Sequence, residues 1–322
     1  MFEIPLNALS EELFPVSYLS ALGVIAVLQR EGLTSYIKWR HDPYWSPVLI
    51  SPIEFDEVAT ALRRGAAARE SELTQTTTNW LEVADMRQIL DDTRFRRNHG
   101  WWWPGLFTEW PIMDTTGRKK PKNESEPKPD LVRLSQIFSV HPELRDKLFS
   151  DILPRLMRKT CEKPDAFQEC LLTRWRNEDY IITTEERDSG GGVNDATFGW
   201  GSVDAAASSQ EPELLRKTST AAALWLVLEG MSFFPTWAVE GNEARTAGVI
   251  RRARTLGQDS RMMWLMPLWE NPLTLPTIRR VVFSMDVTHE NSWRERGIVG
   301  LYACDLISEN KRMILGRPYR VW

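Results

Sequence analysis

Two apolar runs in the C-terminal half constrain the fold of this chain more than any other feature of its sequence. The first covers residues 224–236 and predicts an apolar helix interrupted at Gly230 and Pro235, because glycine and proline both disfavour a helix interior. The second covers residues 264–273, is short, and is closed by prolines. Together the two runs predict that the C-terminal half contains a hydrophobic core.

Composition limits the class of protein. A chain of 322 residues forms one large domain or two of ordinary size. Its net charge of −4 argues against a free-standing, non-specific nucleic-acid-binding protein, but leaves local basic patches open. Three cysteines and four histidines match no zinc-site spacing, so we expect no structural metal and no other cofactor. No secretory leader opens the chain and no apolar run reaches the ~18 residues that span a bilayer. We therefore expect a cytoplasmic protein without a membrane partner.

The chain is rich in tryptophan. It contains 15 Trp, four of which cluster at Trp101, Trp102, Trp103 and Trp110. Tryptophan suits surfaces that are partly apolar and partly wet, such as protein interfaces and base-stacking platforms. Most of these residues also fit a simpler interpretation as large core side chains, and composition leaves both interpretations open.

Hydrophobic periodicity and turn residues predict a mixture of helices and short strands. The predicted helices cover residues 15–30, 51–64, 78–90, 131–140, 142–159, 165–175, 212–230 and 275–283. The predicted strands cover residues 35–39 and 48–50, which form a hairpin, then 180–184, 236–239 and 261–268, and a closing hairpin of 297–303 against 313–322. Strands and helices do not alternate regularly, so the expected class is α+β, with short strands among helices and a helix-rich C-terminal half.

Residues 114–130 separate two predicted regions. This stretch is rich in Lys, Pro and Glu and contains no apolar residue, so it cannot pack and predicts a long mobile loop. Residues 1–113 form a predicted N-terminal α+β region, and residues 131–322 form a helix-rich C-terminal region that ends in the closing hairpin. Either the two regions are separate domains or they share one core.

The sequence carries no catalytic signature. It lacks the G-x-G-x-x-G, P-loop, H-E-x-x-H and G-x-S-x-G motifs. His41, Asp42 and His99 indicate a nuclease only weakly, because the two histidines are far apart in sequence. Asp91 and Asp92 lie next to arginines and predict solvated ion pairs. We expect no enzymatic activity, with an uncharacterised nuclease as an alternative.

Local basic patches are the best candidates for function. Within residues 114–130, four cations and an asparagine able to read a base edge lie almost side by side, at Arg118, Lys119, Lys120, Lys122 and Asn123. Mobile cations of this kind contact phosphates, and each contact steepens the salt dependence of binding. The alternative is a solubilising loop whose charge is balanced by neighbouring glutamates.

A second basic cluster lies beside the three consecutive tryptophans, at Arg94, Arg96, Arg97 and Asn98. Cations next to aromatic rings hold a nucleic-acid backbone while the rings stack or wedge against bases. A helix end beside a tryptophan-lined edge of the core is the alternative. A third cluster consists of Arg251, Arg252 and Arg254. These three do not share one narrow face of a helix, so part of this cluster is expected to be solvated.

The glycine run Gly190, Gly191 and Gly192 has a specific physical use. A backbone without Cβ atoms approaches a duplex groove closely and presents its N–H groups. Because glycine also adopts positive φ, a flexible linker explains the run equally well.

Three segments carry a resemblance to a known family. They are residues 15–23, residues 222–235, and residues 264–273 with the helix and the terminal hairpin that follow. In combination they resemble the large subunit of CRISPR effector complexes of type I-G (formerly I-U), the Cascade assemblies of antiviral defence. These are packing segments, and none is a catalytic motif.

The resemblance implies a function in RNA-guided interference. In that family the guide RNA (crRNA) reads the target by base pairing, while the large subunit recognises the short adjacent motif (PAM) as duplex DNA. The subunit also aids strand opening and recruits the helicase–nuclease. The implied partners are therefore the crRNA-bearing Cascade subunits, target duplex DNA and the helicase–nuclease effector.

The resemblance also implies where DNA would be contacted. Relatives use a glycine-rich loop, a lysine and a wedge at the PAM. By analogy these roles fall on the glycines at 190–192 with Asn194, and on the lysines at 119–122 with their neighbouring asparagine. A protein–protein scaffold whose tryptophan surfaces contact only other subunits, with no direct nucleic-acid contact, is the alternative function.

Overall fold

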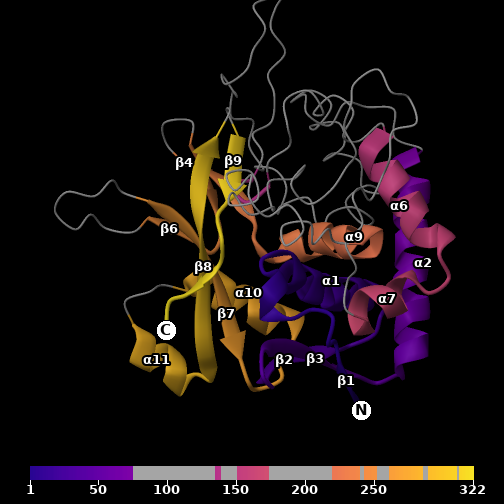
Figure 1. Ribbon diagram of the computed structural model, residues 1–322, viewed down its shortest axis with the longest axis horizontal. Helices are drawn as coiled ribbons and strands as arrows, with labels where there is room; N and C mark the ends of the chain where they lie inside the picture. The colour runs from indigo at the N-terminus through magenta and orange to yellow at the C-terminus, as the bar shows by residue number, and fades with distance from the viewer. Residues whose placement is uncertain are drawn as a thin grey trace, which may run out of the picture.

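The computed structural model describes residues 1–74, 135–138, 151–173, 220–239, 243–251, 261–285, 289–309 and 312–322. Within these residues the protein has helices and antiparallel sheets in irregular order, which confirms the predicted α+β class. Figure 1 shows the largest sheet on one side, two apolar helices in the centre, and a group of helices on the opposite side.

The centre of the fold is the helix pair α1 (Val16–Arg30) and α9 (Ala221–Gly230). The first thirteen residues of α1 are buried, and α9 is buried along its whole length, as expected for helices that are apolar on every side. The helix predicted for residues 15–30 is thereby confirmed. Gly32, with φ +79°, follows α1, and this positive φ is typical of a glycine that ends a helix.

Two glycines set the distance between these helices. A Cβ on Gly23 would lie 1.9 Å from the carbonyl oxygen of Leu226, and one on Gly230 would lie 2.1 Å from the carbonyl oxygen of Leu19. The backbones of α1 and α9 are therefore in direct contact. A side chain at either glycine would force the helices apart.

A small sheet lies next to α1 and has the strand order β1 (Phe2–Pro5), β3 (Trp45–Ser51), β2 (Tyr36–His41). The hairpin of β2 and β3 confirms the predicted one, whereas β1 was not predicted. The small sheet is tied to the rest of the molecule at Ile37. The backbone of Ile37 forms a bridge with Leu273, and its carbonyl accepts a hydrogen bond from the indole Nε1 of Trp269 at 2.8 Å.

The larger sheet has five antiparallel strands. They run in the order β10 (Tyr319–Arg320), β8 (Ile298–Glu309), β7 (Met262–Trp269) and β6 (Val249–Arg251), while β9 (Arg312–Leu315) pairs with the second half of β8. Strand β7 confirms the strand predicted for residues 261–268, and β8 with β9 and β10 confirms the closing hairpin.

A two-stranded ladder, β4 (Thr236–Val239) and β5 (Glu243–Thr246), leads into the larger sheet. The prediction for residues 236–239 is confirmed, and β5 and β6 were missed. Strand β7 is almost entirely buried and reads as a continuous apolar run.

Helices α2 (Phe55–Thr74), α6 (Leu153–Glu162) and α7 (Ala166–Leu172) pack beside α1 and α9, opposite the larger sheet (Figure 1). Helices α10 (Leu275–Ser284) and α11 (Glu290–Glu295) follow the strands of the C-terminal region. Helix α10 confirms the helix predicted for residues 275–283. Within the described residues, α6 and α7 cover the second part of the helix predicted for 142–159 and most of that predicted for 165–175.

Two predicted helix starts are wrong. The prediction placed a helix over residues 51–64, but α2 begins at Phe55, because the backbone N–H of Ile53 donates to Ser51 Oγ in a turn before the helix. The prediction for residues 212–230 is also wrong at its start. Thr220 is extended and its side chain caps α9 by accepting from the N–H of Ala223.

The helix predicted for residues 131–140 is wrong where the structure describes it. Residues 135–138 form a turn closed by the N–H of Phe138 donating to the carbonyl of Ser135 at 3.2 Å. The helix predicted for 78–90 and the strand predicted for 180–184 lie outside the described residues.

One hydrophobic cluster joins residues from both sides of the 114–130 stretch, from Ile4 to Leu315. Aromatic rings mark its centre, where Tyr18 stacks on Trp39 at 5.3 Å and meets Trp264 edge to face at 6.1 Å. Among the described residues, no helix is both long enough and apolar enough to cross a membrane.

Candidate functional site

All thirteen residues proposed from the sequence to contact DNA lie outside the described residues. This holds for the cluster that begins at Arg94, the cluster that begins at Arg118, and the segment from Gly190 to Asn194. What the structure describes is the frame on both sides of the two segments, 75–134 and 174–219, that contain them.

The frame holds the C-terminal end of the first segment through a polar contact with β5. The N–H of Gln136 donates to Thr246 Oγ1 at 3.0 Å, and the N–H of Thr246 donates back to Gln136 Oε1 at 3.0 Å. Ser135 and Thr236 each share a hydroxyl hydrogen bond with Thr246, at 3.1 and 3.0 Å. The contact is partly buried and reciprocal, so it fixes residues 135 and 136 against β5.

The two ends of the second segment lie next to each other. Cys170 on α7 and Thr220, the cap of α9, are joined by a side-chain hydrogen bond. Burial raises the pKa of the Cys170 thiol to about 12, and the hydrogen bond from Thr220 opposes this only in part. The described residues on either side of 174–219 are therefore in contact through Cys170 and Thr220.

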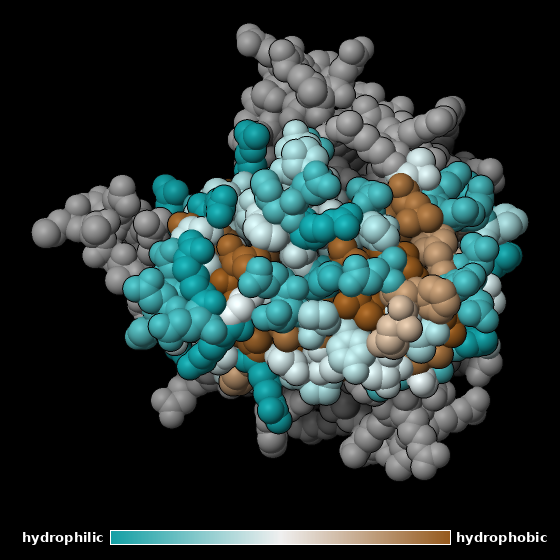
Figure 2. All heavy atoms as spheres, turned by 90° about the horizontal axis from the view of Figure 1, so that it is seen from below, coloured by the Kyte–Doolittle hydropathy of each residue, from teal (hydrophilic) through white to brown (hydrophobic). Residues whose placement is uncertain are grey.

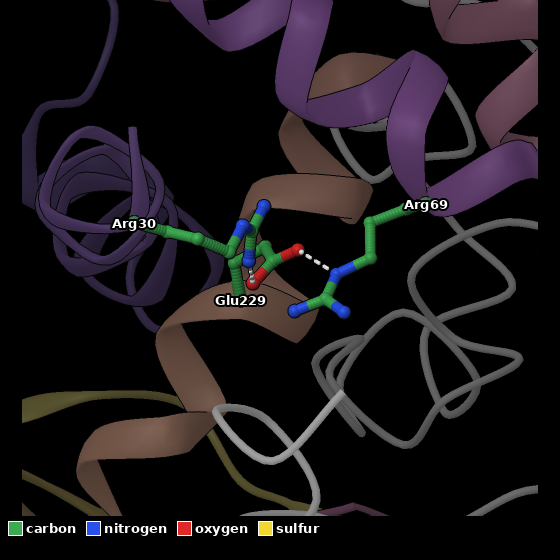
Figure 3. A network of polar contacts seen from close by, with 3 residues as sticks. All are labelled: Arg30, Arg69 and Glu229. Atoms are coloured by element: carbon green, nitrogen blue, oxygen red, sulfur yellow. Dashed lines mark hydrogen bonds and ion pairs between the residues drawn. The ribbon is translucent and has the colours of Figure 1, made fainter. Parts of the chain in front are cut away.

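A buried ion cluster joins the three helices of the frame. Figure 3 shows the carboxylate of Glu229 from α9 between the guanidinium groups of Arg30 from α1 and Arg69 from α2. Arg30 Nη1 lies 2.8 Å from Glu229 Oε2, and Arg69 Nε lies 3.1 Å from Glu229 Oε1. The side chains of Glu229 and Arg69 are only 2% and 1% exposed, so water does not screen the pairing.

The electrostatics of this cluster favour the ionised carboxylate. Burial alone would raise the pKa of Glu229, but the charges and hydrogen bonds of Arg30 and Arg69 outweigh it and lower the pKa to about 2. Because Arg69 lies near the end of α2, the ion cluster also holds α2, the helix that leads into residues 75–134, against α1 and α9.

The described residues contain few candidates for a metal site or a catalytic group. No group of three or more His, Cys, Asp or Glu side chains in the described part of the chain could hold a metal ion. His41 and Asp42 are exposed at the tip of the β2–β3 hairpin, and His99, the other histidine of the nuclease alternative, lies outside the described residues. Burial raises the pKa of the Cys304 thiol, which makes a reactive thiolate unfavourable there.

Sequence reasoning missed the ion cluster, although one signal was available. Glu229 follows eight consecutive apolar residues, 221–228, and a carboxylate in such a run requires a buried cation. Which arginines supply the positive charge could not be read from the sequence, because Arg30 and Arg69 are far from Glu229 along the chain.

No protein-family model matches the chain, and no curated protein matches it at a significant level.

Proposed function

We propose that this chain is the large subunit of a crRNA-guided DNA surveillance complex of the type I-G Cascade kind. In this role it recognises the PAM in duplex DNA, aids strand opening and recruits the helicase–nuclease. It acts through binding, without a catalytic site or cofactor of its own, and it works in the cytoplasm alongside the subunits that carry the guide RNA.

The observation that carries the proposal is the packing of the three resembling segments on one another. Residues 15–23 lie in and before α1, residues 222–235 in and after α9, and residues 264–273 in and after β7. Gly23 contacts the backbone of Leu226, and the hydroxyl of Tyr18 donates to the carbonyl of Pro267 at 3.1 Å. Segments far apart in sequence thus form one continuous core, which supports reading their combination as one scaffold.

The same scaffold holds the segments that carry the proposed DNA contacts. Residues 75–134 run from α2, which Arg69 ties to Glu229, to Gln136, which binds Thr246. Residues 174–219 begin and end beside Cys170 and Thr220. A buried core whose described residues are held in place next to both segments suits a subunit that presents basic and glycine-rich backbone to a duplex.

The overall charge fits a member of an assembly. A chain of net charge −4 does not bind DNA through its general field. Local cations on the two segments would add phosphate contacts, while pairing with the guide supplies the sequence information. PAM recognition would then require only a few contacts from this subunit.

Reconstitution tests the proposal. The chain is co-expressed with the guide-RNA-bearing backbone subunits of a type I-G system, and duplex binding is measured with and without the chain. We expect the chain to co-purify with the guide complex, and we expect PAM-dependent duplex binding only when it is present. Failure to co-purify, or duplex binding that does not change when the chain is left out, would contradict the proposal.

A scaffold subunit without nucleic-acid contact is the alternative, and one surface favours it. Figure 2 views the molecule from the side of the small sheet and shows apolar side chains gathered among hydrophilic ones. Met1 is 70% exposed and Phe2 on β1 is 42% exposed. If the chain co-purifies with the guide complex but duplex binding is independent of it, the scaffold function is correct.

A further inference from the structure

An exposed aromatic pair lies between α10 and β4. The rings of Phe283 and Trp237 are 5.3 Å apart and tilted by 31°. Phe283, a large apolar side chain near the end of α10, is 62% exposed. Trp237 is half-buried beneath it. The pair therefore presents part of the Phe283 ring to solvent while the tilted Trp237 ring supports it.

Two arginines flank this pair. Arg245 on β5 is the cross-strand partner of Trp237, so the two side chains lie on the same face of the ladder. Arg280 lies one helical turn before Phe283 on α10, which places the two as neighbours on the helix surface. Both arginines are exposed.

The charges of these arginines are not neutralised within the described part of the chain. Among the side chains that the structure describes, no carboxylate forms an ion pair with Arg245 or Arg280. Several other exposed arginines do have such a partner; the pairs are Arg64–Glu31, Arg158–Glu70, Arg261–Asp305 and Arg294–Glu290. The surface around Phe283 thus combines an aromatic face with two arginines that no described carboxylate side chain neutralises.

We propose that Trp237, Phe283, Arg245 and Arg280 form a binding surface for unpaired nucleotides. A base stacks on the exposed part of Phe283 and extends the Trp237–Phe283 stack, while the two guanidinium groups contact the flanking phosphates. Every base has an aromatic face, so this surface holds single strands without reading their sequence. The inference rests on the proposed function in that strand opening creates such a single strand.

Charge complementarity favours a nucleic acid over a protein as the occupant. A protein partner for an exposed Phe–Trp pair would bring apolar side chains, and the two arginines would then lose water without gaining a partner. Phosphates spaced along a single strand supply an anion for each arginine. Aromatic rings with adjacent cations are the usual composition of single-strand binding surfaces.

Fluorescence anisotropy of the full chain tests the inference, with labelled oligo-dT and oligo-U of about 16 nucleotides as probes. We expect Phe283→Ala to raise the Kd for single strands about tenfold and Phe283→Trp to preserve binding. We expect Arg245→Gln with Arg280→Gln to reduce the slope of log Kd against log salt by about 1.4, about 0.7 for each phosphate contact. The DNA and RNA probes show which kind of single strand the surface prefers.

The β2–β3 hairpin provides matched controls. Tyr44→Ala removes an aromatic ring that is 46% exposed, and Arg40→Gln removes an exposed arginine; neither is expected to change the Kd. Thermal unfolding confirms that each variant folds. Phe283→Leu keeps the apolar volume but removes the aromatic ring, so it separates the effect of base stacking from that of apolar packing. The inference is overturned if the chain binds neither probe, if Phe283→Ala behaves like Tyr44→Ala, or if Phe283→Ala releases a protein partner while oligonucleotide binding stays intact.

Failure of this inference is distinguishable from failure of the proposed function. If oligonucleotide binding does not depend on Phe283 but the reconstituted complex binds duplex in a PAM-dependent way, only the proposed single-strand surface is rejected. Binding that depends on Phe283, together with no effect of the chain on the guide complex, removes only the proposed role in surveillance.

Discussion

The backbone of Gly23 on α1 packs directly against the carbonyl group of Leu226 on α9. A Cβ at position 23 would lie 1.9 Å from the Leu226 oxygen, far inside the closest approach of real atoms. Helices α1 and α9 pack closely against each other, so this contact sets the geometry of the whole core. The proposed scaffold depends on it, because α1 and α9 contain two of the three segments that resemble a Cascade large subunit.

Gly23→Ala is expected to destabilise the protein by at least about 1–3 kcal/mol, since overpacking a close backbone contact forces the two helices apart. Urea unfolding measures the change. Gly300→Ala on β8 is the control, because an added Cβ there would meet nothing nearer than 3.8 Å. Equal unfolding midpoints for the two variants would show that α1 and α9 do not pack as described.

Glu229→Gln is expected to cost about 3–5 kcal/mol at pH 7, because it leaves Arg30 and Arg69 buried without their carboxylate. The control is Glu290→Gln, which breaks a half-exposed ion pair with Arg294 within α11 and is expected to cost about 0–1 kcal/mol. The free energy of unfolding from urea titrations checks both. A loss at Glu229 no larger than that at Glu290 would contradict the buried pairing.

The same carboxylate predicts a pH dependence. The pKa of Glu229 is lowered to about 2 in the folded protein, whereas an unfolded glutamate titrates near ~4.3. Its contribution to stability is therefore fully present above about pH 5 and is lost as the pH falls towards 2. Between about pH 5 and pH 3, Glu229→Gln should lose less stability than the wild type does. Parallel curves over this range would count against the assignment.

Gln136→Ala is expected to weaken the contact that holds residues 135–138 against β5. The variant leaves the N–H of Thr246 without its Gln136 Oε1 acceptor, which costs about 1–3 kcal/mol in a buried site. Hydrogen exchange should speed up at residues 135–138 and 243–251 while α1 stays protected. Thr60→Ala, which removes an exposed hydrogen bond on α2, should leave exchange at these residues unchanged. Unchanged exchange in Gln136→Ala itself would exclude the anchoring role.

The parts of the fold that could be predicted from the sequence are those with a local pattern. Helix α1 has apolar residues at helical spacing and Gly32 at its end, and strands β2 and β3 flank a short turn at residues 42–44. Strand β1 has only four residues, and its pairing with β3 is non-local. The start of α9 depends on capping by Thr220, and the helical pattern of the sequence before Thr220 hid this start.

The functional candidates divide in the same way. Clusters contiguous in sequence, such as the lysines at 119–122, could be recognised, although they lie outside the described residues. Trp237 and Phe283 come from elements far apart in the chain, so only the structure brings their rings together. The Glu229 cluster likewise draws on three helices.

Duplex binding by the assembled complex, measured as a function of salt, examines whether the 114–130 stretch contacts target DNA. Lys119, Lys120 and Lys122 are replaced together by Ala, and the control is Lys159→Ala on α6 with Lys163→Ala just after this helix. We predict that the triple variant weakens PAM-dependent binding. We also predict that it reduces the slope of log K against log salt by about 2–3, because each lost phosphate contact lowers the slope by about 0.9. Unchanged affinity together with an unchanged slope would show that this stretch does not touch the duplex and would contradict the proposed DNA-binding role.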